Sequence, residues 1–267
     1  MATVYIKPGS GSGSGTQAAP YFYNELATAE SAAGSGGTIL FTDGSYATKN
    51  FASSGVTYES ENLHGASFTG TGKNFGGSSA SVTVRKMKIV LDSSQTIDLI
   101  GASTLIDQCH VKVGPSSYLF DVNTVGIKIT NCLLENNVNA PGNFLGDHFN
   151  RLAEFSGNTY FVSNINGKSA NTVDFDRSGG ALASAKNCIF ASDDTADNVI
   201  VASGQGTYGN AALTAGVSTN CCFSGFGTGN LSGGTNNVFS DPLLVDSANG
   251  DLRLRPSSPC INAGTTS

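Results

Sequence analysis

Aspartates recur inside short apolar segments, where stacking of the chain would bring them together. Asp98, Asp121 and Asp174 each stand between two apolar residues, and Asp147 could extend the series. In a β-strand the apolar neighbours would face inward and each Asp outward. Two carboxylates at the right separation can act as acid and base or nucleophile on a glycosidic bond, and several together can hold Ca²⁺. The alternative is a row of solvated positions without chemistry.

A second group of titratable residues lies where the stretch between two apolar segments is lengthened. Asp147, His148, Arg151 and Glu154 have the types needed for acid–base work, and lengthened loops on a rigid scaffold often carry function. The alternative is a solvated loop. The same interpretation applies to the two consecutive aspartates at 193–194, which lie in a polar segment. The sequence alone assigns a catalytic role to none of these residues.

The cysteine and histidine pattern gives no indication of a metal site. The chain has 6 Cys and 3 His but no CxxC pair, which disfavours structural zinc. We therefore expect no cofactor, with Ca²⁺ on the aspartate row as the alternative. The cysteines are expected to be buried, reduced thiols, because the chain is long and shows no export signal.

An internal repeat would position these residues. Six segments share one frame, in which a small or soft residue is followed two positions later by a large apolar one. They are residues 84–89, 106–111, 129–134, 156–161, 185–190 and 218–223. Their central positions are 22, 23, 27, 29 and 33 residues apart, and such steps are typical of solenoid repeats.

Each column of this frame has a physical interpretation. The central column would stack inside the molecule, whereas the position before it is mostly Asn, which tolerates the left-handed backbone of a sharp bend. The predicted stack consists of Met87, Cys109, Cys132, Thr159, Cys188 and Cys221, beside Asn131, Asn158, Asn187 and Asn220. Corresponding strands of successive coils would then pair in parallel, about 4.8 Å apart.

The repeat predicts an all-β fold, a right-handed parallel β-helix with a short N-terminal capping helix. We expect a single domain over residues 1–267, with an N-terminal cap at 1–36, coils at 37–235 and a C-terminal cap at 236–267. The capping helix is expected within 17–33, an Ala-rich stretch with roughly helical spacing of its apolar residues.

The amino-acid composition limits the classes of partner that the chain can bind. Only 13% of residues are charged and the net charge is −6, so the chain is a poor candidate for binding nucleic acid. No apolar run approaches the length of a membrane span, and residues 1–8 lack a secretory signal pattern. We expect no nucleic-acid partner, no membrane partner and synthesis in a host cytoplasm without a signal peptide.

Two strings carry a family resemblance that covers nearly the whole chain. GGTILFTDGSY near the N-terminus and DPLLVDSANGDLRLRPSSPCINAG at the C-terminus resemble the pectate-lyase-like right-handed β-helix superfamily. The resemblance implies the fold, but the superfamily includes polysaccharide lyases, glycoside hydrolases, adhesins and phage spike or fibre proteins. The chain lacks most of the Asn-Thr-Asp, Asp-Asp, Gly-His-Gly and Arg-Ile-Lys motifs of the galacturonase-type hydrolases, and basic residues near the aspartate row are few.

These observations favour a bacteriophage virion structural protein, either a capsid decoration (cement) protein or a tail fibre or spike module. By resemblance to the superfamily's phage members, we expect a homotrimer. Its expected partners are its own copies, other virion proteins and host surface polysaccharide. The alternatives are a polysaccharide-degrading enzyme, such as a tailspike depolymerase, lyase or glycoside hydrolase, and a secreted carbohydrate-binding protein.

Overall fold

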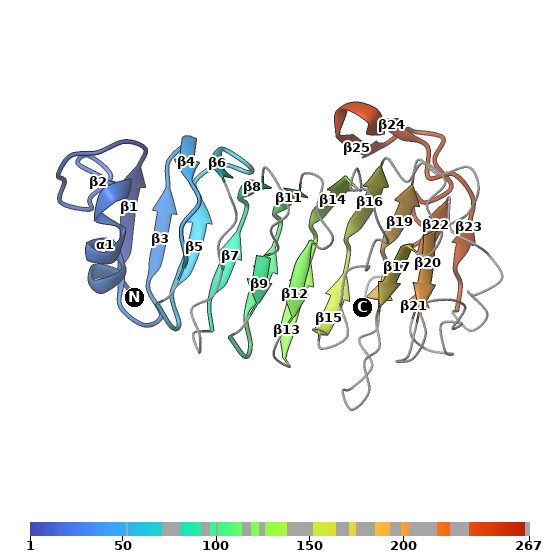
Figure 1. Cartoon of the computed structure of the whole chain (residues 1–267), viewed down its shortest axis with the longest axis horizontal. Helices are drawn as coiled ribbons and strands as arrows, with labels where there is room; N and C mark the ends of the chain where they lie inside the picture. Colours follow the sequence, from blue (N-terminus) through green and yellow to red (C-terminus); the bar gives the residue numbers. More distant parts are fainter. Residues whose placement is uncertain are drawn as a thin grey trace.

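The chain folds into a stack of coils whose strands run in parallel from one coil to the next (Figure 1). The computed structural model describes residues 1–51, 53–70, 81–91, 97–99, 101–113, 119–122, 126–137, 152–163, 171–174, 185–192, 199–202, 218–224 and 235–264. Among the named strands of these ranges, the β24–β25 hairpin alone pairs antiparallel. The predicted all-β parallel β-helix is therefore confirmed.

Two long sheets carry most of the coils. Sheet A has ten strands in the order β2-β1-β3-β5-β7-β10-β13-β15-β18-β21, and sheet B has nine in the order β23-β22-β19-β16-β14-β11-β8-β6-β4. Sheet A contains β1 (Thr3–Lys7), β2 (Tyr21–Phe22), β3 (Thr38–Phe41), β5 (Thr57–Ser60), β7 (Thr83–Arg85), β10 (Leu105–Asp107), β13 (Ile127–Thr130), β15 (Leu152–Ser156), β18 (Ala185–Lys186) and β21 (Ser218–Thr219). Sheet B contains β4 (Gly44–Ala47), β6 (Ala66–Gly70), β8 (Lys88–Leu91), β11 (His110–Val113), β14 (Leu133–Asn137), β16 (Thr159–Ser163), β19 (Ile189–Ser192), β22 (Cys222–Ser224) and β23 (Val238–Phe239).

A third strand position appears in four coils. β9 (Ile97–Leu99) pairs with β12 (Phe120–Val122), and β17 (Asn171–Asp174) pairs with β20 (Val199–Ala202). These pairs form two separate two-stranded sheets.

One residue in left-handed conformation makes the bend from sheet A to sheet B in each later coil. The φ angles are 57° at Lys86, 55° at Gln108 and Asn131, 66° at Gly157, 52° at Asn187, 53° at Asn220 and 55° at Asn236. Asn and Gly tolerate this conformation, which explains the polar column before the central position. The bend position of each coil also bonds its neighbour: the Gln108 N–H, for example, donates to the Thr130 carbonyl at 3.1 Å.

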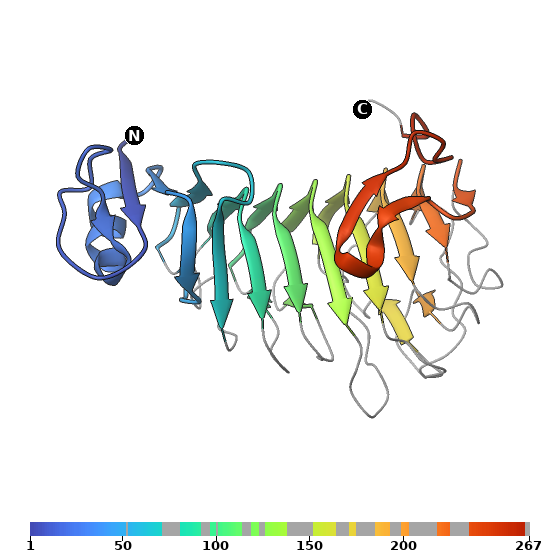
Figure 2. The same ribbon diagram turned by 90° about the horizontal axis from the view of Figure 1, so that it is seen from above.

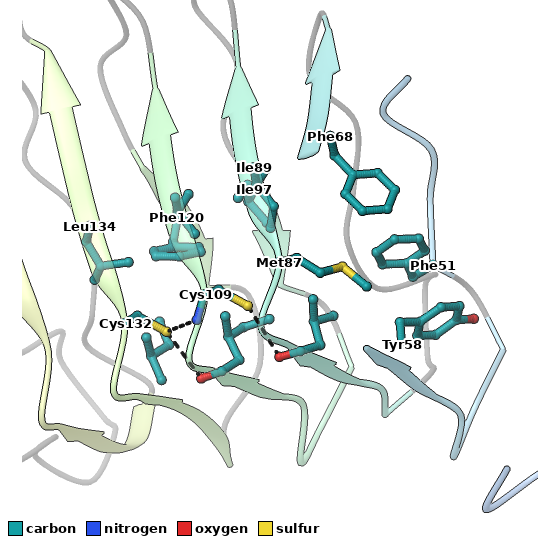
Figure 3. Packing of buried hydrophobic residues seen from close by; sticks show 14 of the residues in the cluster. Phe51, Tyr58, Phe68, Met87, Ile89, Ile97, Cys109, Phe120, Cys132 and Leu134 are labelled. Atoms are coloured by element: carbon teal, nitrogen blue, oxygen red, sulfur yellow. Dashed lines mark hydrogen bonds between the residues drawn. The ribbon is translucent and has the colours of Figure 1, made fainter. Parts of the chain in front are cut away.

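The core is a set of apolar columns that run through the coils, because in-register parallel pairing places like residues on one another. In sheet A one inward column contains Ile39, Tyr58, Val84, Ile106, Ile129 and Phe155, each at most 2% exposed. Figure 3 shows part of the interior, with Met87, Cys109 and Cys132 beside larger apolar side chains. Burial of each large apolar side chain stabilises the fold by about 1.5–3 kcal/mol.

The N-terminal prediction needs correction. The helix α1 covers Leu26–Ala33, so the first half of the expected 17–33 helix is wrong. Pro20 favours an extended residue before it, and Tyr21–Phe22 instead pairs with β1. The helical segment starts only where the Phe22 N–H donates to Glu25 Oε2 at 2.9 Å, at the beginning of the 3-10 turn Tyr23–Glu25.

Strand β1 was not anticipated from the sequence. It pairs in register with β3 and therefore belongs to the first coil. Helix α1 packs against these two strands with Leu26, Ala29 and Ala33 buried. It closes the N-terminal end of the stack (Figure 1), as expected of a capping helix.

At the other end the chain turns back along the side of the stack. The hairpin of β24 (Leu244–Asp246) and β25 (Asp251–Leu254) is joined by a 3-10 turn at Ser247–Asn249. Leu252 and Leu244 pack with Phe161 and Ala191 of sheet B. Figure 2 shows the hairpin crossing the strands of this sheet, so it covers an outward face of the coils.

Candidate functional site

The aspartate row predicted from the sequence is brought together only in part. β9 and β12 pair so that Asp98 lies opposite Asp121. Asp174 belongs to the other small sheet, where it lies opposite Ala202. Asp147 lies outside the described residues.

Of the loop group, Glu154 alone lies within the described ranges; His148, Arg151 and residues 193–194 lie outside them. Glu154 Oε2 is 3.2 Å from Lys128 Nζ, and its Oε1 accepts a hydrogen bond from Ser156 Oγ at 2.8 Å. The bond from Ser156 and the nearby Lys128 lower the pKa of Glu154 despite some burial. A carboxylate held in this way is stabilised in its charged form, which suits a structural ion pair better than a general acid.

The interior column differs from the predicted stack at one coil. The register β14–β16 places Leu133 opposite Thr159, so Cys132 lies opposite Asn158. Asn158 is 1% exposed, whereas Thr159 is half-buried and Gly157 makes the bend. The placement of Thr159 in the column, and of Asn158 at the bend, was therefore wrong by one residue. Met87, Cys109, Cys132, Cys188 and Cys221 occupy the interior column in the predicted register.

The interior side chains bridge successive coils with hydrogen bonds. The Cys132 N–H donates to Asn158 Oδ1 at 2.9 Å, and Asn158 Nδ2 donates to the Ile129 carbonyl at 2.9 Å. Cysteine makes the same pair of contacts: the Cys109 N–H donates to Cys132 Sγ at 3.4 Å, and that thiol lies 3.7 Å from the Ile106 carbonyl (Figure 3). The column is thus structural, and the recurring cysteine is explained without catalysis.

The thiols are free, and burial keeps at least two of the interior ones protonated. All six cysteines are free, five are buried, and Cys260 is half-buried. Burial, followed by contact with the thiol of a neighbouring coil, raises the pKa of Cys132 and of Cys188 well above the usual range. These two groups are therefore hydrogen-bond donors and not nucleophiles at neutral pH.

A groove that the sequence reasoning missed runs across the outer side of the bends. It has a volume of about 540 Å³, and we call it the bend groove. Its lining is Glu61, Asn62, Leu63, His64, Lys86, Gln108, Asn131 and Leu133. Lys86, Gln108 and Asn131 are bend residues of successive coils, so the polar column before the central position was the signal that could have located it.

Ion pairs lie along one wall of the bend groove. Lys86 Nζ is 2.5 Å from Glu59 Oε1, and Arg85 lies between Glu59 (3.7 Å) and Asp107 (3.2 Å). Asn131 Nδ2 donates to Asp107 Oδ1 at 2.9 Å. Both carboxylates are therefore already bound by cations or amides.

Two imidazoles lie beside the other wall. His64 Nε2 is 3.1 Å from the Gln108 carbonyl, and the His64 and His110 rings are 5.7 Å apart. His110 is hydrogen-bonded to Glu135, whose other oxygen is 2.9 Å from Lys112 Nζ. Burial, and then the neighbouring His110, lower the pKa of His64, so its ring is neutral at pH 7.

The described residues offer no cluster of three or more His, Cys, Asp or Glu able to hold a metal ion. Within the same part of the chain, no helix combines the length and apolarity required to span a bilayer. The arrangement in the bend groove can donate and accept many hydrogen bonds but shows no pair of free carboxylates among the residues that line it.

Comparisons with known proteins give a single kind of finding, a likeness of fold. No family model matches the chain, and no curated protein matches it. A solved structure described as the crystal structure of pectate lyase Pel9A is similar over 100% of this chain and 92% of its own, with 15% identity and a TM-score of 0.48.

Proposed function

We propose that the chain is a structural and recognition module that binds a saccharide chain in the bend groove without cleaving it. Side chains with amide and imidazole groups line the groove and can form hydrogen bonds with sugar hydroxyls. Leu63 supplies an apolar surface that is 62% exposed. Six of the eight lining residues are polar and supply hydrogen-bond donors and acceptors that sugar hydroxyls can use. The polar bend residues recur from coil to coil, so the groove can follow an extended ligand.

The pairing of the nearby carboxylates with cations and amides is the observation that supports binding without cleavage. Glycosidases use two carboxyl groups that flank the scissile bond. Here Glu59 is paired with Lys86 and Arg85, and Asp107 is held by Arg85 and Asn131. Glu61 is the one carboxylate of the described lining, and Asp43, next to the lining, accepts a hydrogen bond from Asn62. One such group is insufficient for the two-carboxylate reaction.

Binding is tested by titrating purified protein with oligosaccharides in a calorimeter, and by repeating the titration with Gln108→Asn. This variant keeps a residue that tolerates the left-handed bend but shortens the amide side chain by one methylene. We expect saturable binding that weakens by about tenfold in the variant, the loss of roughly one good hydrogen bond. Equal affinity in the variant would place the ligand elsewhere, and cleavage of the ligand would rule out a purely binding role.

The proposed setting is the bacteriophage particle, as a capsid decoration protein or a tail fibre or spike module. An elongated stack with few charges and abundant Gly, Ser, Thr and Asn supports a particle component. The proposed partners are its own copies in a homotrimer, other virion proteins and host surface polysaccharide. Mass spectrometry of purified particles would find the protein at a copy number typical of capsid or tail, and its absence from particles would exclude this setting.

A polysaccharide-cleaving enzyme is the second candidate, because Asp98 and Asp121 are in register on adjacent strands. Neighbouring parallel strands lie about 4.8 Å apart, which is close to the separation of the carboxyl pair in retaining glycosidases. Release of reducing ends, or a rise in absorbance from unsaturated products, would detect the activity. Its loss in Asp121→Asn would assign it to this pair, whereas unchanged activity would exclude the pair.

A further inference from the structure

We infer that the bend groove selects uncharged saccharide segments and rejects segments rich in uronate carboxylates. The inference rests on the proposed binding function and adds the chemical class of the ligand. The cations and the carboxylates that line and surround the groove support this inference.

Two of the cations beside the groove, Lys86 and Arg85, are already bound to carboxylates of the protein. Lys86, the lysine of the lining, lies 2.5 Å from Glu59, and Arg85 lies between Glu59 and Asp107. A uronate would have to replace these partners and leave a half-buried protein carboxylate unpaired. Leaving the less exposed Glu59 carboxylate without its cations carries a desolvation cost that opposes the exchange.

His64, the histidine of the lining, supplies no positive charge at neutral pH. His64 lines the groove, but burial and the neighbouring His110 and Lys88 disfavour its charged form. Lys112, further along sheet B, is bound to Glu135 at 2.9 Å. The lining therefore presents the groove with hydrogen-bonding groups and with the paired Lys86, whereas Lys88, a neighbour of His64 with no ion pair among the described residues, lies outside the lining.

The surrounding carboxylates outnumber the cations. Five carboxylates lie in or next to the lining, against four cations: Asp43, Glu59, Glu61, Asp107 and Glu135, against Arg85, Lys86, Lys88 and Lys112. Like charges brought together in an interface oppose binding. A uronate in the groove would meet Glu61, whereas a sugar hydroxyl can donate to the same carboxylate.

The remaining groups fit the hydroxyls and ring faces of uncharged sugars. The side chains of Gln108 and Asn131 carry amides with both donor and acceptor atoms, and the exposed Leu63 offers an apolar surface to a sugar ring. No charge compensation is needed for such a ligand. The groove is thus complementary to neutral sugar chains.

The experiment compares neutral gluco-, manno- and xylo-oligosaccharides with oligogalacturonates of the same length, by calorimetry at low ionic strength. Wild-type protein is expected to bind at least one neutral series at least about tenfold more tightly than the uronates. Glu61→Lys reverses the charge that faces the ligand and is expected to reduce this ratio to near one. Glu154→Lys changes the net charge by the same amount outside the groove lining and should leave the ratio unchanged.

The outcomes separate the two proposals. Wild-type binding of oligogalacturonate as tight as that of the neutral series would overturn the selectivity and leave saccharide binding intact. Binding of none of the oligosaccharides would overturn the proposed function itself. An equal response to Glu61→Lys and Glu154→Lys would show that net charge, and not the groove, sets the preference.

Discussion

At the scale of single residues, the interior of several bends holds one side chain that can both accept and donate a hydrogen bond, whereas Met87 occupies the same column without a donor. A bend interrupts the sheet ladder and leaves a backbone N–H and a carbonyl that must still be satisfied. Asn158 fills this role with its amide, and Cys132 fills it with a thiol in the preceding coil. Either Asn or Cys can therefore occupy this interior position, and its hydrogen bonds explain both residues without a catalytic role.

Replacement of Asn158 tests this role. Asn158→Ala removes both bonds and leaves the Cys132 N–H and the Ile129 carbonyl buried without these partners. We expect the free energy of unfolding to fall by about 2–5 kcal/mol, measured by chemical denaturation. Asn158→Cys restores the chemistry of the neighbouring coils and should recover much of the loss. A similar loss in both variants would contradict the bridging role.

The same position shows where sequence alignment reached its limit. The frame 156–161 contains Gly157 followed by Asn158, and both residues tolerate a left-handed bend. The alignment placed Asn at the bend by analogy with the other coils. The register of β14 and β16 selects Gly157 instead, which moves Asn158 into the interior and shifts the strand after it by one residue.

Backbone conformation at the bend gives a second prediction. Gln108 has φ of 55°, a conformation that is strained for β-branched residues. Gln108→Val is expected to lower the free energy of unfolding by about 1–2 kcal/mol, whereas Gln108→Asn should leave it equal or slightly higher. Denaturation of the two variants side by side would measure the difference, and equal stabilities would mean that the bend relaxes.

At the scale of elements, the C-terminal hairpin accounts for an outward apolar patch on sheet B. In the frame 156–161 Phe161 stands two positions after the assigned central residue, and the alternation of a strand would turn it inward, but the register puts Tyr160 in the inward column, opposite Phe190. Phe161 is instead covered from outside, together with Ala191, by Leu252. A hairpin distant in sequence therefore buries a surface that the repeat alone would leave exposed.

Truncation of Leu252 tests the attachment of this hairpin. Leu252 is 3% exposed, and Leu252→Ala is expected to weaken docking by about 2–5 kcal/mol. Hydrogen exchange should accelerate in β24 and β25, while the coils of sheet A keep their protection. Loss of protection in all coils would show that the hairpin is required for the stack itself.

The ionisation of Glu135, in strand β14, makes the stability of this part of sheet B depend on pH. Burial alone would raise the pKa of Glu135, but hydrogen bonds from His110 and Lys112 outweigh it, so that the pKa is lowered. A lowered pKa in the folded state stabilises the protein above the unfolded pKa of about 4.5, and this contribution is lost as the pH falls through the folded value. The stability difference between wild type and Glu135→Gln should therefore shrink as the pH is lowered below about 4.5. A constant difference would contradict the ion-pair role.

At the scale of the whole molecule, the repeat was sufficient to predict the stack but not the groove. In-register parallel pairing places like residues on one another, so the recurrence of Cys and Asn from coil to coil identifies which strands pair. The bend groove is assembled from residues of separate coils, among them Glu61, His64 and Gln108. Their proximity depends on the bend angle and on side-chain packing, which periodicity does not specify.

A stack in which each coil contacts chiefly its neighbours should also lose stability locally. Phe68 lies in an aromatic cluster of the first coils, with ring centroids 5.2 Å from Phe41, 5.0 Å from Tyr46 and 5.5 Å from Phe51. Phe68→Ala is expected to cost about 3–5 kcal/mol in this region.

Hydrogen exchange measures how far that loss extends. Protection should fall in β3–β8 and remain in β16–β22, because the coils between them keep their own contacts. Ile261→Ala, at a residue 41% exposed in the C-terminal segment, is the matched control and should change neither region much. Equal loss of protection along the whole stack in Phe68→Ala would instead show that the coils unfold as one cooperative unit, since a nearest-neighbour solenoid confines such damage to the coils around it.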